Sequence, residues 1–571
     1  MRTNFLLIAL ASCGLLLSAC QKQVDPEISV EPKKCTVKAE GENVTVSVSC
    51  NTEWTASVSD YWISVEPSSG KGDANVVIKV AASTEARSGK VTFIADLKTA
   101  RFEITQEKPD SPDVPGPGPD TPTKLTEIKS DADFASFAAN LDKYADDDVV
   151  SLEANVNATA IIEGNIAFTF DGKGHTVTYD IVATDISDDA KNVGLFRTVT
   201  GTIKNLKTSG TLTASPEAGS GTYHIGGIAG LAYDTAVFDT CENGVKILAD
   251  TKVTHHMGGI VGYSAAGAKI LNCKNTAAVE MIIPERGASN ASQLGGIVGH
   301  IEAKGDIEDC SNSGQVTYEG NGTPRIAGIC GYFNNLEEGL FKNCTNSGTI
   351  AYNSNYDNTK WSYVGGITGY YGTPTTGAKV VYENCVNDGS VELNITETKS
   401  KCRAAGIAAH GGVSGGDDGT HTWELKNCVN NGTVMSSSTT ANNFLGGIMG
   451  YCEVSAIVIC DGCTNNGKIS TAGNGSVGGI HGRNCSVKSQ FTNFTIGKNS
   501  AVSVGGGDFI GLAIGYAHAE GLSSAITGKV QGGKYMKGSD TVDVDESNYA
   551  SLLVGHTIGS AGSVTGVTFA K

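Results

Sequence analysis

The sequence predicts an all-β protein, in which a small β-sandwich is followed by a long right-handed parallel β-helix. A glycine-rich unit of the form Gly-Gly-Ile-x-Gly returns every 32 to 41 residues or so, which is the period of solenoids and other repeat arrays. A second unit of the form Cys-x-Asn lies between its copies, and the repeat has two β-type segments and no helical pattern. Each copy is therefore expected to form one coil. A β-propeller has a similar period, but its blades need four strands each, and the segments here are too few.

The first 19 residues have the features of a secretory signal peptide, because Arg2 precedes an apolar run that is too short to span a bilayer. The four residues that end at Cys20 read Leu-Ser-Ala-Cys and resemble the bacterial lipobox. That resemblance implies removal of residues 1–19, lipid attachment to Cys20 and a tether over residues 20–27. Gln21 implies sorting to the outer membrane, on its surface or periplasmic side. The alternative is an ordinary secretory signal in which Cys20 has no special role.

The composition limits the partners that the chain can have. Its formal net charge of −18 repels phosphate backbones, so nucleic acid is not an expected partner. No apolar stretch after the signal approaches the roughly 20 residues of a transmembrane helix, so contact with the membrane is expected through the lipid anchor. Glycine makes up 73 of the 571 residues without the three-residue period of collagen, and it returns instead at fixed places of the longer repeat.

Residues 28–107 alternate apolar and polar side chains between turn signals, which predicts the small β-sandwich. Several short motifs in this segment resemble the BACON domain of secreted Bacteroidetes proteins, and the resemblance implies either carbohydrate binding or a passive spacer. Trp54 and Trp62 could stack on sugars or pack in the core. Cys35 and Cys50 flank a predicted hairpin turn and could form a disulfide. The motifs are Asn51-x-x-Trp54, Trp62-Ile63, Pro67-x-x-Gly70, Arg87-x-Gly89 and Ile104-x-Gln106.

Residues 108–124 are rich in proline, which favours extended polyproline geometry and predicts a semi-rigid linker between two domains. The β-helix repeat domain is expected over residues 125–571. Apolar side chains at helical spacing predict a helical cap at about residues 130–144. Residues 528–571 keep strand-like patches without the repeat, so they are expected to cap the other end.

The glycine-rich unit resembles the GLUG-type repeats of bacterial surface adhesins and of noncatalytic regions of IgA-protease-like proteins. The resemblance covers about residues 165–520 and implies the solenoid architecture without naming a ligand. Glycine suits places where the chain turns a corner or approaches the neighbouring coil closely. The copies begin at Gly226, Gly258, Gly295, Ala327, Gly365, Ala405, Gly446 and Gly478.

Seven cysteines occupy one position in successive copies and are expected to stack about 4.8 Å apart in one buried column. Side chains in such a column point the same way, which fits poorly with the torsion of a disulfide, so a ladder of small apolar residues is predicted. The adjacent asparagines are expected to form a second ladder of side-chain amides. The cysteines are Cys241, Cys273, Cys310, Cys344, Cys385, Cys428 and Cys463; the asparagines are Asn275, Asn312, Asn346, Asn387, Asn430 and Asn465.

The residue after the last glycine of each unit is aromatic or histidine in most copies. If these side chains face outward, they form a strip along the solenoid with one member per coil. Tyrosine and histidine offer both a flat face and a polar tip, so the strip is a candidate surface for an extended glycan. The alternative is a stabilising aromatic ladder without a ligand. The candidates are Tyr263, His300, Tyr332, Tyr370, His410 and Tyr451, followed by Arg483 and Tyr516.

The longest insertions between repeat units are further candidate sites, because function on a solenoid collects in loops on one face. Asp417 and Asp418 form the only acidic pair of a long loop near a histidine. The residues singled out in these insertions are Trp361, Asp417, Asp418, His421 and Trp423.

The function expected from these features is a non-catalytic binding or adhesion module of the cell envelope, for glycans or another surface ligand. A purely structural scaffold is the first alternative. A polysaccharide-active enzyme is the second, since parallel β-helices include lyases and glycoside hydrolases. Hydrolysis needs two carboxylates about 5 to 9.5 Å apart, and acidic residues recur here at no fixed position of the repeat. The sequence therefore predicts no catalytic residues, no metal site and no cofactor.

Overall fold

The structure is a computed structural model, in which the chain divides into two compact units, residues 1–121 and 122–571. It describes residues 26–570 with the exception of several short segments. Cys20, Asp417, Asp418 and most of the proline-rich linker lie outside the described residues. The excepted segments are 59–61, 84–85, 96–97, 108–123, 184–190, 216–221, 234, 251–253, 266, 284–290, 356–360, 373–376, 397–400, 413–420, 454–455, 486–488, 508, 519–525 and 559–565.

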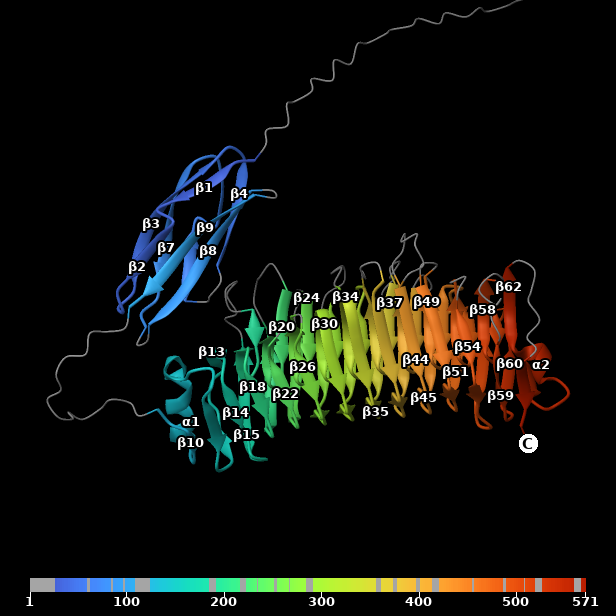
Figure 1. Ribbon diagram of the computed structural model, residues 1–571. Coiled ribbons are helices and arrows are strands. Elements are labelled where there is room, and N and C mark those ends of the chain that lie inside the picture. Colours follow the sequence, from blue (N-terminus) through green and yellow to red (C-terminus); the bar gives the residue numbers. More distant parts are fainter. Residues whose placement is uncertain are drawn as a thin grey trace, which may run out of the picture. The chain divides into compact units, whose positions relative to one another are not determined.

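The first unit is a β-sandwich of a four-stranded and a five-stranded sheet (Figure 1). Its strands alternate buried and exposed residues, and the buried ones form one core between the sheets. Trp54 and Trp62 are part of this core, so neither offers a free face for a sugar. The strands are β1 (Ile28–Glu31), β2 (Lys34–Val37), β3 (Glu42–Cys50), β4 (Glu53–Val58), β5 (Ile63–Glu66), β6 (Ser69–Lys71), β7 (Ala74–Val80), β8 (Arg87–Ala95) and β9 (Lys98–Gln106).

The disulfide considered between Cys35 and Cys50 is not formed, and both residues are free thiols. The expectation was wrong because β2 and β3 do not form a hairpin. Cys35 lies in the five-stranded sheet opposite Ile104, whereas Cys50 lies in the four-stranded sheet opposite Ile28.

The second unit is a parallel β-solenoid, which confirms the fold class predicted from the repeat (Figure 1). Three sheets run along it, here called sheets 1, 2 and 3, with 22, 22 and 10 strands. Sheet 3 contains β16 (Asn192–Val193), β20 (Thr222–Gly226), β24 (Thr254–Gly258), β29 (Gln293–Gly295), β33 (Arg325–Ala327), β37 (Trp361–Gly365), β42 (Lys401–Ala405), β47 (Asn443–Gly446), β52 (Ser476–Gly478) and β57 (Ile510–Gly511).

Sheets 1 and 2 continue through almost every coil. Sheet 1 contains β10 (Glu127–Ile128), β11 (Val149–Leu152), β13 (Ile162–Ile166), β14 (Thr169–Asp171), β17 (Phe196–Val199), β18 (Thr202–Lys204), β21 (Ala229–Ala232), β22 (Val237–Asp239), β25 (Val261–Ser264), β26 (Lys269–Leu271), β30 (Val298–Glu308), β34 (Cys330–Lys342), β38 (Thr368–Tyr371), β39 (Lys379–Glu383), β43 (Ala408–Gly411), β44 (His421–Lys426), β48 (Met449–Cys452), β49 (Ala456–Asp461), β53 (His481–Asn484), β54 (Gln490–Thr492), β58 (Ile514–His518) and β62 (Val554–Ile558). Sheet 2 contains β12 (Val156–Asn157), β15 (Thr176–Ala183), β19 (Lys207–Ala214), β23 (Glu242–Asp250), β27 (Lys274–Asn275), β28 (Val279–Ile282), β31 (Ser311–Asn312), β32 (Val316–Glu319), β35 (Thr345–Asn346), β36 (Ile350–Ser354), β40 (Val386–Asn387), β41 (Val391–Ile395), β45 (Val429–Asn430), β46 (Val434–Ser436), β50 (Thr464–Asn465), β51 (Lys468–Thr471), β55 (Phe494–Ile496), β56 (Ala501–Val504), β59 (Thr527–Val530), β60 (Lys534–Lys537), β61 (Asp540–Asp543) and β63 (Gly566–Phe569).

One coil shows how the repeat folds. Strand β24 of sheet 3 ends at the Gly-Gly-Ile corner, and the chain then enters sheet 1 through β25 and β26. A second corner at Asn272, whose φ is 53°, leads past Cys273 into β27 and β28 of sheet 2. Asparagine tolerates this left-handed conformation better than most residues, and Asn or Asp occupies the corner in most coils. The next coil then begins with β29 in sheet 3.

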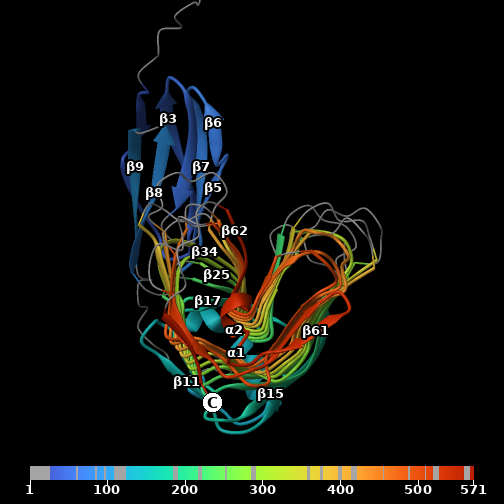
Figure 2. The same ribbon diagram turned by 90° about the vertical axis from the view of Figure 1, so that its right-hand side faces the viewer.

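The view along the solenoid axis shows successive coils stacked over one another, with a cross-section of two arms (Figure 2). Each sheet 3 strand contacts the sheet 1 strands that follow it in the chain, as β24 contacts β25 and β30. Both strands of each such pair also supply residues to the main hydrophobic core, as β24 does with Met257 and β25 with Val261.

The glycine pair at the first corner is required by close backbone contact between coils. A Cβ atom on Gly366 would lie 2.0 Å from the carbonyl oxygen of Gly406 in the next coil and 2.4 Å from the Asn387 side chain. No L-side chain can occupy that space without moving the backbone.

Both ends of the solenoid carry helical elements. At the N-terminal end, α1 (Asp131–Ala138) begins after Ser130, whose hydroxyl accepts a hydrogen bond from the Asp133 amide, and a 3₁₀ turn η1 (Leu141–Lys143) follows. At the other end, residues 527–569 still supply sheet strands and include the short helix α2 (Tyr549–Leu552). No helix among the described residues has the length and apolar character needed to cross a membrane.

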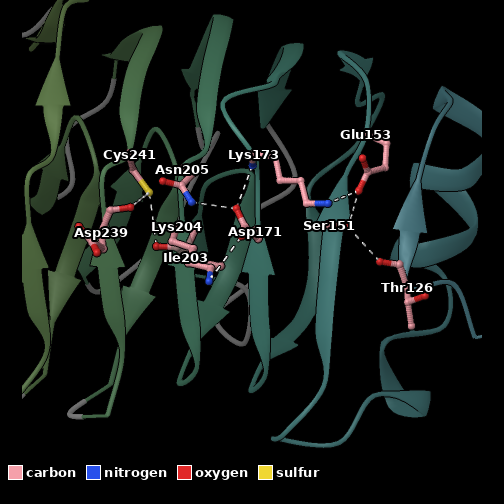
Figure 3. A network of polar contacts seen from close by, with 10 residues as sticks. All are labelled: Thr126, Ser151, Glu153, Asp171, Lys173, Ile203, Lys204, Asn205, Asp239 and Cys241. Carbon is pink, nitrogen blue, oxygen red and sulfur yellow. Dashed lines mark hydrogen bonds and ion pairs between the residues drawn. The ribbon is translucent and has the colours of Figure 1, made fainter.

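The seven repeat cysteines are buried free thiols in one column at the second corner. Each thiol donates a hydrogen bond to a backbone carbonyl of the preceding coil, as Cys241 Sγ does to Ile203 O at 3.4 Å. Figure 3 shows this corner in the first coils, where Asn205 also donates to Asp171 at 3.0 Å. Burial raises the pKa of Cys241, which keeps the thiol protonated.

The adjacent asparagines form a continuous ladder of side-chain amides. The Nδ2 atom of each member donates to Oδ1 of the member in the next coil, at distances between 2.7 and 2.9 Å. Asn243 begins this ladder, one coil before the first asparagine that the sequence predicts in it. The members are Asn243, Asn275, Asn312, Asn346, Asn387, Asn430 and Asn465.

The ladder thiols are expected to resist alkylation in the native protein. Of the cysteines in the described residues, only Cys35 and Cys485 are half-buried, and all others are buried. Iodoacetamide should therefore label these two first and reach the ladder only after unfolding in guanidinium, which peptide mass spectrometry can follow. Native labelling of the ladder, or disulfides between its members, would contradict the column of free thiols.

Candidate functional site

The candidate site consists of two facing columns of side chains, one from sheet 3 and one from sheet 1, here called the strip. Within each column the members are in register from coil to coil. The strands are about 4.8 Å apart, so each column has one member per 4.8 Å or so. The sheet 3 column contains His224, His256, Gln293, Arg325, Tyr363, Arg403 and Phe444; the sheet 1 column contains Tyr263, His300, Tyr332, Tyr370, His410, Tyr451, Arg483 and Tyr516.

The two columns contact each other across the first corner. His224 stacks on Tyr263 with ring centroids 4.5 Å apart, and Tyr363 meets Tyr370 edge to face at 4.5 Å. The contacts also run along the axis, because His410 stacks on Tyr370 at 4.4 Å and on Tyr451 at 5.7 Å, with interplanar angles of 6° and 5°. Many ring faces are therefore covered by other rings, and the edges and polar tips remain for contact with a ligand.

Three arginines are held between the aromatic rings. The Arg325 guanidinium carbon lies 4.5 Å from the ring centre of Tyr332 and 4.8 Å from that of Tyr370. Arg403 lies 3.8 Å from the ring of Tyr451 and also contacts Trp361. Arg483 lies 4.3 Å from the ring of Tyr516. These cation–π contacts fix the guanidinium planes. Arg325 Nη1 also donates to the Ala291 carbonyl at 3.4 Å, and Arg403 Nη1 donates to Glu453 at the same distance.

Two carboxylates contact the strip. Glu302 accepts from His300 Nε2 at 2.9 Å and from the Asn334 amide. Glu453 accepts from the Tyr451 hydroxyl at 3.1 Å and forms an ion pair with Arg403 at 3.4 Å.

Burial determines the protonation of the strip at neutral pH. It raises the pKa of Tyr263, Tyr332 and Tyr363 to about 12, so these hydroxyls remain protonated. It lowers the pKa of His224 to about 4 and that of His410 to about 3, so both imidazoles are neutral. The charged groups of the strip at pH 7 are therefore its arginines and the two carboxylates beside it.

The strip residues differ in their exposure. Tyr263, Tyr332, Tyr370 and Tyr451 are half-buried and can be reached from solvent. His300 and His410 are only 7% and 2% exposed. They pack against the tyrosine rings of neighbouring coils and offer little surface to solvent. Trp361 is half-buried at the start of β37, with its ring 5.2 Å from that of Phe444, and it extends the strip beside Arg403.

Two other predicted candidates are core residues. Trp423 was expected in an exposed loop, but its exposed fraction is 1% and it packs edge to face on Tyr371 at 5.0 Å. His421 is 6% exposed on the same strand. The expectation was wrong because β44 begins at His421 and alternates buried and half-buried residues from there.

The sheet 3 column was not predicted from the sequence. Its members stand two residues before the glycine pair, or the Ala-Gly that replaces it, in successive copies. Their identities vary between histidine, glutamine, arginine, tyrosine and phenylalanine, so only the shared position could have revealed them. Among the described residues, no group of three or more His, Cys, Asp or Glu side chains is arranged to hold a metal ion.

Comparison with family models identifies two segments. The BACON domain, described as "Putative binding domain, N-terminal", matches residues 52–107, and the GLUG motif matches residues 290–317. The BACON and GLUG resemblances are thereby confirmed, the first over residues 52–107 and the second over a single copy of the repeat. A comparison with curated proteins gives no match. The two matched families indicate a binding or adhesin-type module.

Three solved structures are similar to parts of the chain. A Bacteroides ovatus GH5 xyloglucanase in complex with a XXXG heptasaccharide is 19% identical over 29% of this chain and 38% of its own, with a TM-score of 0.14. A "putative immunoglobulin A1 protease" from Bacteroides ovatus is 14% identical over 78% of this chain and 84% of its own, with a TM-score of 0.23. WR4, a C. elegans MSP family member, is 13% identical over 14% of this chain and 97% of its own, with a TM-score of 0.12. Such low TM-scores give no basis for transferring an activity.

Proposed function

We propose that this chain is a non-catalytic binding protein of the bacterial cell envelope, lipid-anchored at Cys20 in the outer membrane, whose solenoid binds an extended glycan along the strip. The observation that carries the proposal is the two-column strip itself, with half-buried tyrosine and arginine side chains outside the apolar interior. Its spacing of about 4.8 Å per coil is comparable to the length of one sugar unit in an extended chain. Successive coils would then contact successive sugars.

The ligand would contact edges and polar tips more than ring faces, because many faces already stack within the strip. The protonated hydroxyls of Tyr332 and Tyr370 can donate and accept hydrogen bonds, as can the hydroxyls of a sugar. The arginine edges add donors between them. This arrangement favours a polar, extended ligand over an apolar one.

A structural scaffold remains the competing function, and the stacking of Tyr370, His410 and Tyr451 favours it. Such contacts stabilise the packing of sheet 3 on sheet 1 whether or not a ligand binds. The two roles differ in what the hydroxyl groups do, since a scaffold needs the rings and a binding surface also needs their polar tips.

The proposal assigns no reaction to the strip. Glu302 lies in the coil of His300 and Glu453 in the coil of Tyr451, four coils further along the register. Four coils correspond to about 19 Å, whereas glycoside hydrolysis needs two carboxylates about 5 to 9.5 Å apart. Both carboxylates are also engaged by strip residues.

The test is a glycan-array screen of the mature chain and of a Tyr332→Phe/Tyr370→Phe variant. Loss of two hydrogen bonds of about 1 kcal/mol each should weaken binding of a recognised glycan at least about tenfold. The stacked rings are retained, so the melting temperature should be nearly unchanged. Tyr549→Phe is the matched control, because Tyr549 is a half-buried tyrosine outside the strip. The proposal would be refuted if no glycan on the array bound the parent. It would also be refuted if the Tyr332→Phe/Tyr370→Phe variant and the Tyr549→Phe control both bound with the affinity of the parent.

A further inference from the structure

The three arginines of the strip recur at every second coil. Register pairs Arg325 with Tyr363, and Tyr363 with Arg403, so the two arginines are two coils apart. Arg403 is followed by Phe444 and then by Ser476, whose coil also contains Arg483. The arginines are thus spaced by about 10 Å along the solenoid, and the two coils between them carry Tyr363 with Tyr370 and Phe444 with Tyr451 at the strip.

The charges of these arginines are compensated unequally. Arg403 is 5% exposed and forms its ion pair with Glu453. Arg325 and Arg483 are half-buried, and neither forms an ion pair with a carboxylate in the described part of the chain. Glu302, the other carboxylate at the strip, is engaged by His300 and Asn334.

This imbalance stands out because the chain has 60 acidic and 42 basic residues. An acidic protein has many carboxylates with which a partly buried guanidinium could be paired, and leaving one unpaired is unfavourable. Both guanidiniums are also fixed between rings, Arg325 by Tyr332 and Tyr370, and Arg483 by Phe444 and Tyr516. Arg325 forms one long hydrogen bond, from Nη1 to the Ala291 carbonyl at 3.4 Å, and the Nε atoms of Arg325 and Arg483 are buried without an acceptor. A fixed guanidinium that has no carboxylate partner is suited to bind a carboxylate or sulfate.

We infer that the glycan bound by the strip is acidic, and that Arg325 and Arg483 bind carboxylate or sulfate groups on its sugars. This inference rests on the proposed glycan-binding function and adds the class of ligand. Arg325 and Arg483 are four coils apart, or about 19 Å along the solenoid, so they would contact acidic groups about four sugars apart on an extended polymer. Nucleic acid fits less well, because its charges recur more densely and the net charge of −18 repels it.

The experiment measures binding of the mature chain to immobilised hyaluronan, chondroitin sulfate, alginate and polygalacturonate, each beside its carboxyl-reduced form. Carboxyl reduction keeps the chain length and the hydroxyls and removes the carboxylate charges. At least one acidic polymer should bind, and its affinity should fall steeply between 50 and 500 mM NaCl or so. After carboxyl reduction, chondroitin sulfate should retain part of its binding through its sulfate groups.

Arg325→Gln and Arg483→Gln should each weaken binding of the acidic polymer about tenfold, because each removes a charge-assisted contact. Arg325→Lys keeps the positive charge but lacks the planar guanidinium. Its affinity for the acidic polymer should lie between that of the parent and that of Arg325→Gln. Arg101→Gln, at an exposed position of the sandwich, is the control and should bind as the parent does. Circular dichroism verifies that every variant is folded.

The outcomes separate this inference from the proposed function. Equal binding of acidic and carboxyl-reduced polymers, with no effect of Arg325→Gln or Arg483→Gln, would overturn the acidic-ligand inference. If the Tyr332→Phe/Tyr370→Phe variant still lost binding in that case, the glycan-binding function would stand. If no polymer bound at all, the acidic-ligand inference would fall, and the glycan-array screen would decide whether the glycan-binding function falls with it.

Discussion

Replacing Asn346 by alanine is expected to destabilise the solenoid by about 3 to 5 kcal/mol, because it interrupts the buried amide ladder. Asn346 is fully buried and accepts a hydrogen bond from Asn312 Nδ2 at 2.9 Å. Its own Nδ2 donates to Gly348 O at 2.9 Å and to Asn387 Oδ1 at 2.8 Å. Truncation thus deprives three buried polar groups of a partner, and each such loss costs about 1 to 3 kcal/mol.

The measurement is urea denaturation followed by circular dichroism, with Asn394→Ala as the matched control. Asn394 is exposed and donates to Asn353 Oδ1 at 3.0 Å across neighbouring coils, so it makes a similar contact in water. Its replacement should change the free energy of unfolding by no more than about 0.5 kcal/mol. Equal effects of the two substitutions would mean that burial of the ladder contributes nothing to stability.

Lowering the pH from 7.5 to 5 is expected to destabilise the solenoid and to leave the N-terminal sandwich nearly unaffected. Burial lowers the pKa of His224 to about 4, and it lowers the pKa of His255, His410 and His481 to about 3. All ten histidines of the chain follow residue 124, so the sandwich contains none.

The direction follows from where protons bind. An unfolded histidine has a pKa near 6.5, so below that pH the unfolded chain takes up protons that the folded chain does not. The stability that the neutral buried imidazoles contribute is complete above pH 6.5 and is lost as the pH falls from there toward 3 or 4. At pH 5 the loss is about 2 kcal/mol for each such imidazole.

Thermal unfolding of the whole chain at both pH values tests this, together with the variant His481→Met. Met449 occupies the same register position one coil earlier, so methionine fits the column. The variant should match the parent at pH 7.5 and be more stable than the parent at pH 5 by about 2 kcal/mol. A sandwich that loses as much stability as the solenoid, or an unchanged pH dependence in His481→Met, would show that these imidazoles are not the cause.

The fold followed from the sequence wherever the repeat places the same residue type at the same position. The stacking of Asn312 on Asn346 could be predicted because parallel, in-register coils bring equivalent repeat positions together. The same residue type occurs at this position in successive copies, so the position can be recognised in the sequence. The residue types in the sheet 3 column differ from copy to copy, as from His256 to Arg325 and Tyr363. No single residue type therefore identifies this column in the sequence. Its position two residues before the glycine pair was the remaining signal.

Side-chain orientation was harder to predict than position. Trp423 lies after a long insertion, and only the alternation that begins at His421 shows that it points into the core. The sequence predicts that the flat ring faces of the strip could contact a glycan. In the structure the rings of Tyr370 and His410 stack on each other instead, because neighbouring coils are about as far apart as two stacked rings. The absence of a disulfide between Cys35 and Cys50 depends on sheet pairing across the sandwich, which local sequence does not reveal.

The in-register stacking of whole coils has a consequence for how such a chain can change in length. Because Asn312, Asn346 and Asn387 occupy equivalent places, excision of one complete unit would rejoin every column to its next member. A deletion inside a strand would shift the columns of that strand, whereas the segments between strands already differ in length from coil to coil. The number of coils can therefore change by whole units without loss of register, and removal of the unit between Arg325 and Arg403 would place these two residues in adjacent coils. Such a deletion would change the spacing of the charged side chains along the solenoid.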